Sequence, residues 1–85
     1  MRIRLRLLAT LRRYLPADAS RLTEDTVELD LPEGTSAAAL IARLGLAKGE
    51  WALVMIDGRH QRYEELGRAL AEGQSLTIAP PVAGG

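Results

Sequence analysis

Three short stretches of this chain alternate apolar and polar residues with a period of two. In residues 2–8, isoleucine and leucines lie between arginines, and residues 26–31 and 75–79 repeat the alternation with other side chains. Successive side chains of a strand point to opposite faces, so this pattern predicts strands that each bury one face. The fold must therefore contain a sheet with an apolar side and a polar side.

One stretch has the helical period instead. A helix is expected to begin at a cap on Thr35 or Ser36 and to run to about Leu44, with Gly45 ending it in a left-handed conformation. Its buried stripe is formed by Ala37, Leu40, Ile41 and Leu44. This is the main helix that the sequence predicts.

The remaining elements are shorter. Residues 9–15 are predicted to form about two helical turns, with Thr10 able to cap them. The apolar run 51–56 is predicted to be a strand, and Asp57-Gly58 is typical of a type I′ hairpin turn. A short returning strand is expected near residues 59–62, and a weak helix from Tyr63 to Ala71.

The order of these elements predicts an α+β fold. The first two strands should pair antiparallel, and the last strand should lie parallel beside the first after a right-handed crossover. This arrangement is the ubiquitin-like β-grasp, a mixed sheet of four to five strands with one main helix across one face. We expect a β-grasp domain over residues 1–79 and an extended C-terminal arm over residues 80–85.

Composition excludes several classes of function. The chain has 11 basic and 11 acidic residues, so it lacks the basic surplus typical of proteins that bind nucleic acid. It has no cysteine, which rules out disulfides and thiolate metal sites, and no metal site is expected. Neither a signal peptide nor a membrane-spanning run is apparent, so we expect no membrane association and a cytoplasmic location.

The charges are segregated along the chain. Arginines gather in the first 13 residues, and acidic residues follow between Glu24 and Glu33. Since the two segments are predicted to pair, a ladder of ion pairs across the strands is favoured over a nucleic-acid patch. The expected members are Arg2, Arg4, Arg6, Arg12, Arg13, Glu24, Asp25, Glu28, Asp30 and Glu33.

The sequence ends in Gly84-Gly85, after the stiff segment Pro80-Pro81-Val82-Ala83. A glycine carboxylate has no side chain beside it and can enter a narrow channel, and residues 80–85 extend over about 20 Å. The alternative is a loose end without a role. Other candidates are weaker, because His60 has no predicted catalytic partner and the adjacent Glu64 and Glu65 do not face one another on a helix.

Several segments together resemble the MoaD/ThiS family of sulfur carriers, and most closely the small subunit of molybdopterin synthase. The most specific is the closing segment 80–85. The others are Ala9–Leu15, Pro32–Ser36, Leu44–Leu46 and Val54–Arg59. The chain departs from the family at Gly73-Gln74, at Ala79 before the prolines, and in its long stretch from Asp18 to Asp25.

The resemblance implies a carrier that is not an enzyme on its own and binds no cofactor. An E1-like adenylating enzyme would use ATP to activate the carboxylate of Gly85, and a sulfur donor would convert it to a thiocarboxylate. The arm would then enter the large subunit of molybdopterin synthase. On this interpretation Gly85 carries the sulfur, Gly84 gives clearance, and Pro80, Pro81, Val82 and Ala83 form the partner-binding arm.

Two other functions share this fold and terminus. One is a carrier that supplies sulfur to another pathway, such as thiamine, thionucleoside or amino-acid synthesis. The other is a ubiquitin-like modifier that is joined to lysines of target proteins. A plain interaction module would use the fold without any chemistry at Gly85. Fold alone does not separate these possibilities.

Overall fold

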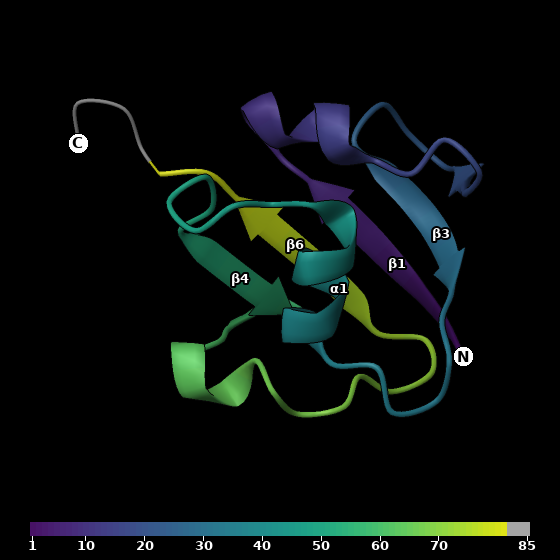
Figure 1. Ribbon diagram of the computed structural model, residues 1–85. Coiled ribbons are helices and arrows are strands. Elements are labelled where there is room, and N and C mark those ends of the chain that lie inside the picture. Colours follow the sequence, from purple (N-terminus) through teal and green to yellow (C-terminus); the bar gives the residue numbers. More distant parts are fainter. Residues whose placement is uncertain (82–85) are drawn as a thin grey trace.

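The computed structural model describes residues 1–81 and shows one mixed sheet with a helix across one face (Figure 1). The six strands lie in the order β2-β3-β1-β6-β4-β5, so the predicted sheet is confirmed but has more strands than the four to five expected. Their bounds are β1 Arg2–Leu7, β2 Ser20–Arg21, β3 Thr26–Asp30, β4 Leu53–Ile56, β5 Arg59–His60 and β6 Ser75–Ala79.

The pairing follows the topology predicted from the order of the elements. β1 runs antiparallel to β3 and parallel to β6, where Leu5 lies opposite Leu76. β6 in turn runs antiparallel to β4, with Val54 opposite Ile78. The last strand of the sequence is therefore a central strand of the sheet. The additional strand, β2, lies in the long connection after residue 15 and pairs with the outer edge of β3.

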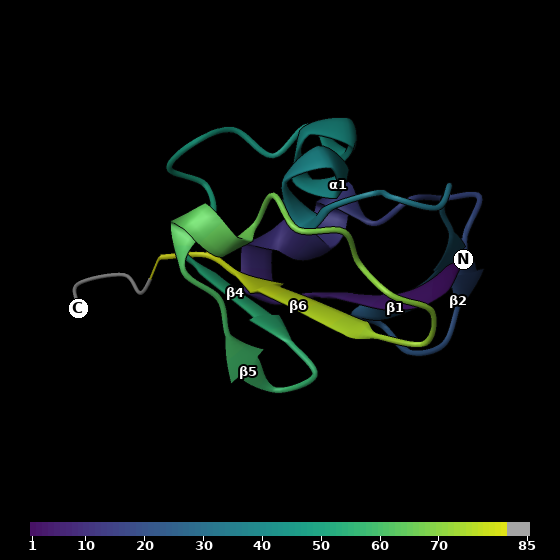
Figure 2. The ribbon, with the colours of Figure 1, turned by 90° about the horizontal axis from the view of Figure 1, so that it is seen from below.

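Helix α1 comprises Ala37–Leu44 and begins as predicted. The side chain of Ser36 accepts a hydrogen bond from the backbone N–H of Ala39 at 3.1 Å, which satisfies one of the free donors of the first turn. Gly45 ends the helix with a φ of 82°, a conformation that glycine adopts without strain. Figure 2 shows α1 on one side of the sheet, and in residues 1–81 no helix covers the opposite side.

The two other helical segments are short 3-10 turns, η1 at Ala9–Tyr14 and η2 at Tyr63–Glu65. Thr10 does not cap η1, because the capping position is Leu8. The predicted helix from Tyr63 to Ala71 is wrong beyond its first turn.

The leucines at positions 66 and 70 are instead buried from a chain that runs beside the entry of α1. The N–H of Leu70 donates to the carbonyl of Thr35 at 2.8 Å, and Ala69 forms an isolated bridge with Ser36. Backbone pairing with the helix entry thus replaces the helical hydrogen bonds, while the same leucines reach the core.

The core lies between α1 and the sheet. Every second residue of β1 and β6 is buried there, and within residues 1–81 no charged or polar side chain is buried. Its largest fully buried members are Ile3, Leu5, Leu7, Leu11, Val27, Leu40, Val54, Leu76 and Ile78. Within residues 1–81, no helix has the length and apolar character needed to cross a bilayer.

Candidate functional site

The end of β6 is the candidate site, because the strand leads from the centre of the sheet into the predicted arm. Ala79 is the last residue of β6, and Pro80 and Pro81 follow it. Figure 1 shows β6 running toward one edge of the domain. Pro80 is half-buried and Pro81 is exposed. The other predicted site residues, Val82, Ala83, Gly84 and Gly85, lie outside the described part of the chain.

Two flanking segments hold the last residues of β6. The N–H of Leu8, at the start of η1, donates to the carbonyl of Ile78 at 3.0 Å. On the other side, the N–H of Ala52, just before β4, donates to the carbonyl of Ala79 at 2.9 Å. The strand is therefore hydrogen-bonded on both sides up to the residue before Pro80, which sets the direction in which the chain leaves the sheet.

The uncovered side of the sheet is partly apolar near this end. Leu53 and Met55 on β4 lie opposite Ala79 and Thr77 on β6, and all are half-buried. Their neighbours in each strand, such as Val54, are buried under α1 on the other side. The predicted strand over residues 51–56 thus contributes both to the core and to an open surface beside the chain exit.

The predicted charge ladder lies along β1, β3 and the adjoining loops, and the structure confirms it in part. Arg13 pairs with Glu50 instead, and Glu33 lies 3.9 Å from the N-terminal amine. The guanidinium of Arg2 lies 3.6 Å from Glu28 and 3.4 Å from Asp30, and that of Arg6 lies 3.2 Å from Asp25. Arg12 pairs with Glu24 at 3.5 Å.

Hydrogen bonds from Thr26 and Thr23, followed by the bond from Arg6, lower the pKa of Asp25 below its ordinary value. Because the charges neutralise one another across the strands, this surface does not present the uniform positive field that nucleic acid requires.

A polar cluster near the site was not predicted from the sequence. One carboxylate oxygen of Glu50 accepts a hydrogen bond from the hydroxyl of Tyr14 at 2.5 Å, and also one from Arg13 at 3.3 Å. Its other oxygen accepts the backbone N–H of Ala47 at 2.8 Å. The bond from Tyr14, above all, and the bond from Ala47 lower the pKa of Glu50. The partners lie 36 residues apart, and no local pattern in the sequence marks them.

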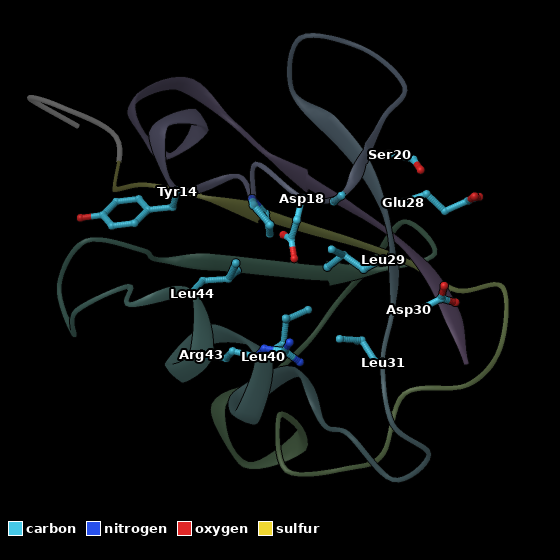
Figure 3. Close-up of a pocket in the computed structure, with 12 residues that line it drawn as sticks. Tyr14, Asp18, Ser20, Glu28, Leu29, Asp30, Leu31, Leu40, Arg43 and Leu44 are labelled. Carbon is cyan, nitrogen blue, oxygen red and sulfur yellow. The ribbon is translucent and has the colours of Figure 1, made fainter.

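A hollow of about 390 Å³ lies between α1 and β3 (Figure 3). Its apolar wall includes Leu40 and Leu44, and the carboxylate of Asp18 points toward it. Glu28 and Asp30 point away from the hollow toward their ion pairs with Arg2. The lining residues include no histidine, and Asp18 has no second carboxylate facing it, so the hollow does not hold an acid–base pair.

The other weak candidates are also placed by the structure. His60 is exposed on β5, as expected for a residue just after a turn. Glu65 accepts a hydrogen bond from the backbone N–H of Arg62 at 2.8 Å and so caps η2. The adjacent Glu64 takes no part in this bond, so the two carboxylates do not act as a pair. In residues 1–81 no group of three histidine or acidic side chains is arranged to hold a metal ion.

Comparison with known sequences and structures adds to this geometry. The sequence model of the ThiS family matches residues 14–85, which is most of the chain and includes the predicted arm. The chain belongs to the ThiS family. No curated protein matches this ThiS-family chain significantly.

Solved structures support the fold of this ThiS-family chain. A Pyrococcus furiosus protein assigned as molybdopterin converting factor subunit 1 is 18% identical, with a TM-score of 0.68 over 96% of this chain and 99% of the other. SAMP1 from Haloferax volcanii is 22% identical, with a TM-score of 0.65 over 100% of both chains.

A third similar structure is a complex of subunits 1 and 2 of the molybdopterin-converting factor from Helicobacter pylori. Its matching chain is 16% identical, with a TM-score of 0.60 over 100% of both chains. At these identities the likeness establishes the fold, which is the ubiquitin-like β-grasp predicted from the order of the elements.

Proposed function

We propose that this ThiS-family protein is a sulfur carrier whose C-terminal Gly85 is adenylated and then thiocarboxylated. The observation that carries the proposal is the position of β6, a central strand that is hydrogen-bonded on both sides up to Ala79 and continues into Pro80 and Pro81. The domain thereby fixes the point from which the segment after Ala79 can reach a partner. The family match supports a carrier role for the segment that follows.

The proposed arm comprises residues 80–85. Its two prolines restrict the backbone, which reduces the conformational entropy lost when the arm enters a partner's channel. Fully extended, six residues span about 20 Å, enough to place Gly85 inside another protein. Gly84 and Gly85 add no side chain that the channel would need to accommodate.

The chemistry needs two partners beyond this chain. In the first step a carboxylate oxygen of Gly85 attacks the α-phosphorus of ATP on an E1-like adenylating enzyme, forming an acyl-adenylate and releasing pyrophosphate. In the second step a sulfur atom from a donor attacks the acyl carbon, and AMP leaves. Where the donor is a persulfide, the product is an acyl disulfide, and a thiol of the donor then attacks the donor-side sulfur. A disulfide forms on the donor, and the thiocarboxylate of Gly85 is released. The domain supplies the position of the group and contributes no acid or base.

For the pathway, we propose molybdopterin synthesis in the cytoplasm, with this chain as the small subunit of molybdopterin synthase. Two of the similar structures support this assignment, and one of them is a complex between subunits 1 and 2. The half-buried surface around Leu53 and Met55 lies beside the chain exit, where a large subunit that accepts the arm can contact the sheet.

Intact-mass measurement of the protein from its native cells tests the carrier role. The expected species has one oxygen of Gly85 replaced by sulfur. A variant with one extra residue after Gly85 is the control, and it should remain folded but carry no sulfur and fail to support product formation. Full function of the extended variant would contradict the proposal, and adducts to lysines would indicate a protein modifier instead.

A second measurement tests the pathway. The protein is purified from its native cells with associated proteins retained, and a molybdopterin synthase large subunit is expected among them. Activity of the reconstituted pair should require thiocarboxylated Gly85. Sulfur on Gly85 without that subunit, and with transfer to a thiamine, thionucleoside or amino-acid product, would show that the carrier serves a different pathway.

A further inference from the structure

The two segments that hold the end of β6 are also joined to each other. Leu8 leads into η1, which ends at Tyr14, and Ala52 follows closely after Glu50. The hydroxyl of Tyr14 donates to Glu50 at 2.5 Å. A closed ring of contacts therefore surrounds the end of β6. It runs from Ile78 through Leu8 and η1 to Tyr14, across to Glu50, and through Ala52 back to Ala79.

We propose that Tyr14 and Glu50 are positioning residues that close this ring and fix the base of the C-terminal arm. The ring, which we call the exit ring, consists of the hydrogen bonds Leu8–Ile78, Tyr14–Glu50 and Ala52–Ala79. The effect of the exit ring on sulfur transfer rests on the carrier function proposed above. The effect of the exit ring on the mobility of the end of β6 is independent of that function.

The Tyr14–Glu50 bond has the features of a strong link. Its acceptor is ionised, and charge-assisted hydrogen bonds are about twice as strong as neutral ones. The side chain of Glu50 is only 29% exposed, and the backbone N–H of Ala47 orients its other oxygen. Arg13 also reaches Glu50 and lies 5.1 Å from the centre of the Tyr14 ring, but its own side chain is mostly exposed.

Without the Tyr14–Glu50 bond, η1 and the segment before β4 can move relative to each other, although β6 stays paired in the sheet. The bonds that Leu8 and Ala52 donate to the carbonyls of Ile78 and Ala79 then open more often. A partner that binds the arm must then order the end of β6 again. The conformational entropy lost in that ordering weakens the binding of the arm. The reactivity of the Gly85 carboxylate, which is set inside the partner, should stay the same.

The test compares Tyr14→Phe with Tyr63→Phe. Tyr14→Phe keeps the packing of the aromatic side chain and removes only the hydroxyl that contacts Glu50. Tyr63 is 76% exposed, so Tyr63→Phe removes a hydroxyl away from the exit ring and serves as the matched control. Exchange of the Ala52 amide hydrogen should become about tenfold faster in Tyr14→Phe, because this amide opens when the ring opens. It should not change in Tyr63→Phe.

Kinetics with the adenylating enzyme from the same organism provide the second measurement. For Tyr14→Phe, KM for the carrier should rise about fivefold with kcat unchanged, which is the pattern of a weakened binding step. Glu50→Ala should show the same change. In Glu50→Gln the amide oxygen can accept from Ala47 while the amide NH2 donates to the hydroxyl oxygen of Tyr14, a weaker neutral bond, so KM should lie between the wild-type and Glu50→Ala values.

Two results would overturn the proposal. Unchanged exchange at Ala52 in Tyr14→Phe would show that the hydroxyl does not close a ring. Faster exchange with an unchanged KM would show that the ring does not position the arm. Failure of the wild-type protein to be adenylated at all would reject the carrier function instead, and the exchange measurement would still decide whether the exit ring exists.

Discussion

Asp57 and Ser75 are joined by two hydrogen bonds that attach the β4–β5 turn to the first residue of β6. The N–H of Asp57 donates to the carbonyl of Ser75 at 2.8 Å, and the N–H of Ser75 donates to a carboxylate oxygen of Asp57 at 2.9 Å. Asp57 also has a positive φ of 50°, which aspartate and asparagine tolerate better than most residues. One residue thus forms the turn and fixes the start of the central strand.

Replacing Asp57 with alanine should lower the free energy of unfolding by about 1–2 kcal/mol, because the N–H of Ser75 loses its acceptor and the positive φ becomes strained. Asp57→Asn keeps both the oxygen and the tolerance of this φ, and it should cost less than half as much. Urea denaturation of the three proteins measures the difference. Equal losses for the two variants would contradict this account of the turn.

Gly58 completes the same turn with a φ of 80°, in agreement with the predicted type I′ hairpin, in which both central residues have positive φ. A Cβ added there meets nothing within 4 Å, so Gly58→Ala introduces backbone strain without a clash. We expect a loss of about 1 kcal/mol. Gly67→Ala is the matched control, since Gly67 has equal space but no positive φ, and it should be neutral or slightly stabilising.

The cap of α1 can be tested separately from the sheet. Ser36→Ala removes the acceptor for the N–H of Ala39 and should destabilise the protein by about 1 kcal/mol. Ser36→Asp preserves a capping oxygen and should retain most of the stability. Thermal unfolding followed by circular dichroism compares the two, and an alanine variant as stable as the aspartate variant would exclude a role for the cap.

Leu76 tests the core at the central strand. The residue is fully buried between β1 and β4, so Leu76→Ala should lower the free energy of unfolding by about 2–5 kcal/mol through lost burial and a residual cavity. Leu22→Ala is the control, because Leu22 is 47% exposed, and it should change stability by about 0.5 kcal/mol or less. Equal free energies of unfolding for the two variants in denaturant would contradict the burial of Leu76 in the core.

Stability should fall on acidification. The pKa values of Asp25, Glu50 and Glu65 are lower in the folded protein than the ordinary values of 3.8 and 4.5. Above those ordinary values the carboxylates are ionised in both the folded and unfolded states, and their stabilising contribution is fully present. As the pH falls below them, the unfolded state takes up protons first, so stability is lost progressively toward the lower folded-state pKa values.

Asp25→Asn measures how much of this loss of stability at low pH comes from Asp25, whose carboxylate accepts hydrogen bonds from three side chains. The variant cannot ionise at this position, so its stability should depend less steeply on pH below the ordinary value of 3.8 than that of the wild type. Unfolding in urea at a series of pH values measures both slopes. A slope identical to that of the wild type would show that Asp25 has the same pKa in both states.

The sheet and the main helix were predictable from the sequence because their signals are local. Alternation marked β1, β3 and β6, and the serine and glycine at the two ends of α1 acted as expected. The short strand β2 was missed because two exposed residues carry no alternation and depend on the edge of β3. The helix expected after Tyr63 failed because contacts with the entry of α1 outweighed a weak local preference.

The candidate site was predictable to a different extent. The position of Pro80 and Pro81 after a central strand followed from the order of the elements, which the structure confirms. The bond between Tyr14 and Glu50 did not follow, because it depends on how η1 and the segment before β4 approach each other in three dimensions. A contact between two residues so far apart in the sequence leaves no periodic pattern of apolar and polar residues from which it could be predicted.

The place of β6 has a consequence for how the protein folds. Both of its neighbours, β1 and β4, come earlier in the chain and do not pair with each other, so they form one sheet only when residues 75–79 are inserted between them. The first and the last strand of the described chain must therefore pair before the sheet is complete, which is a contact of long sequence separation and slows folding. Strand β6 is thus both the base of the arm and the strand that joins the two halves of the sheet.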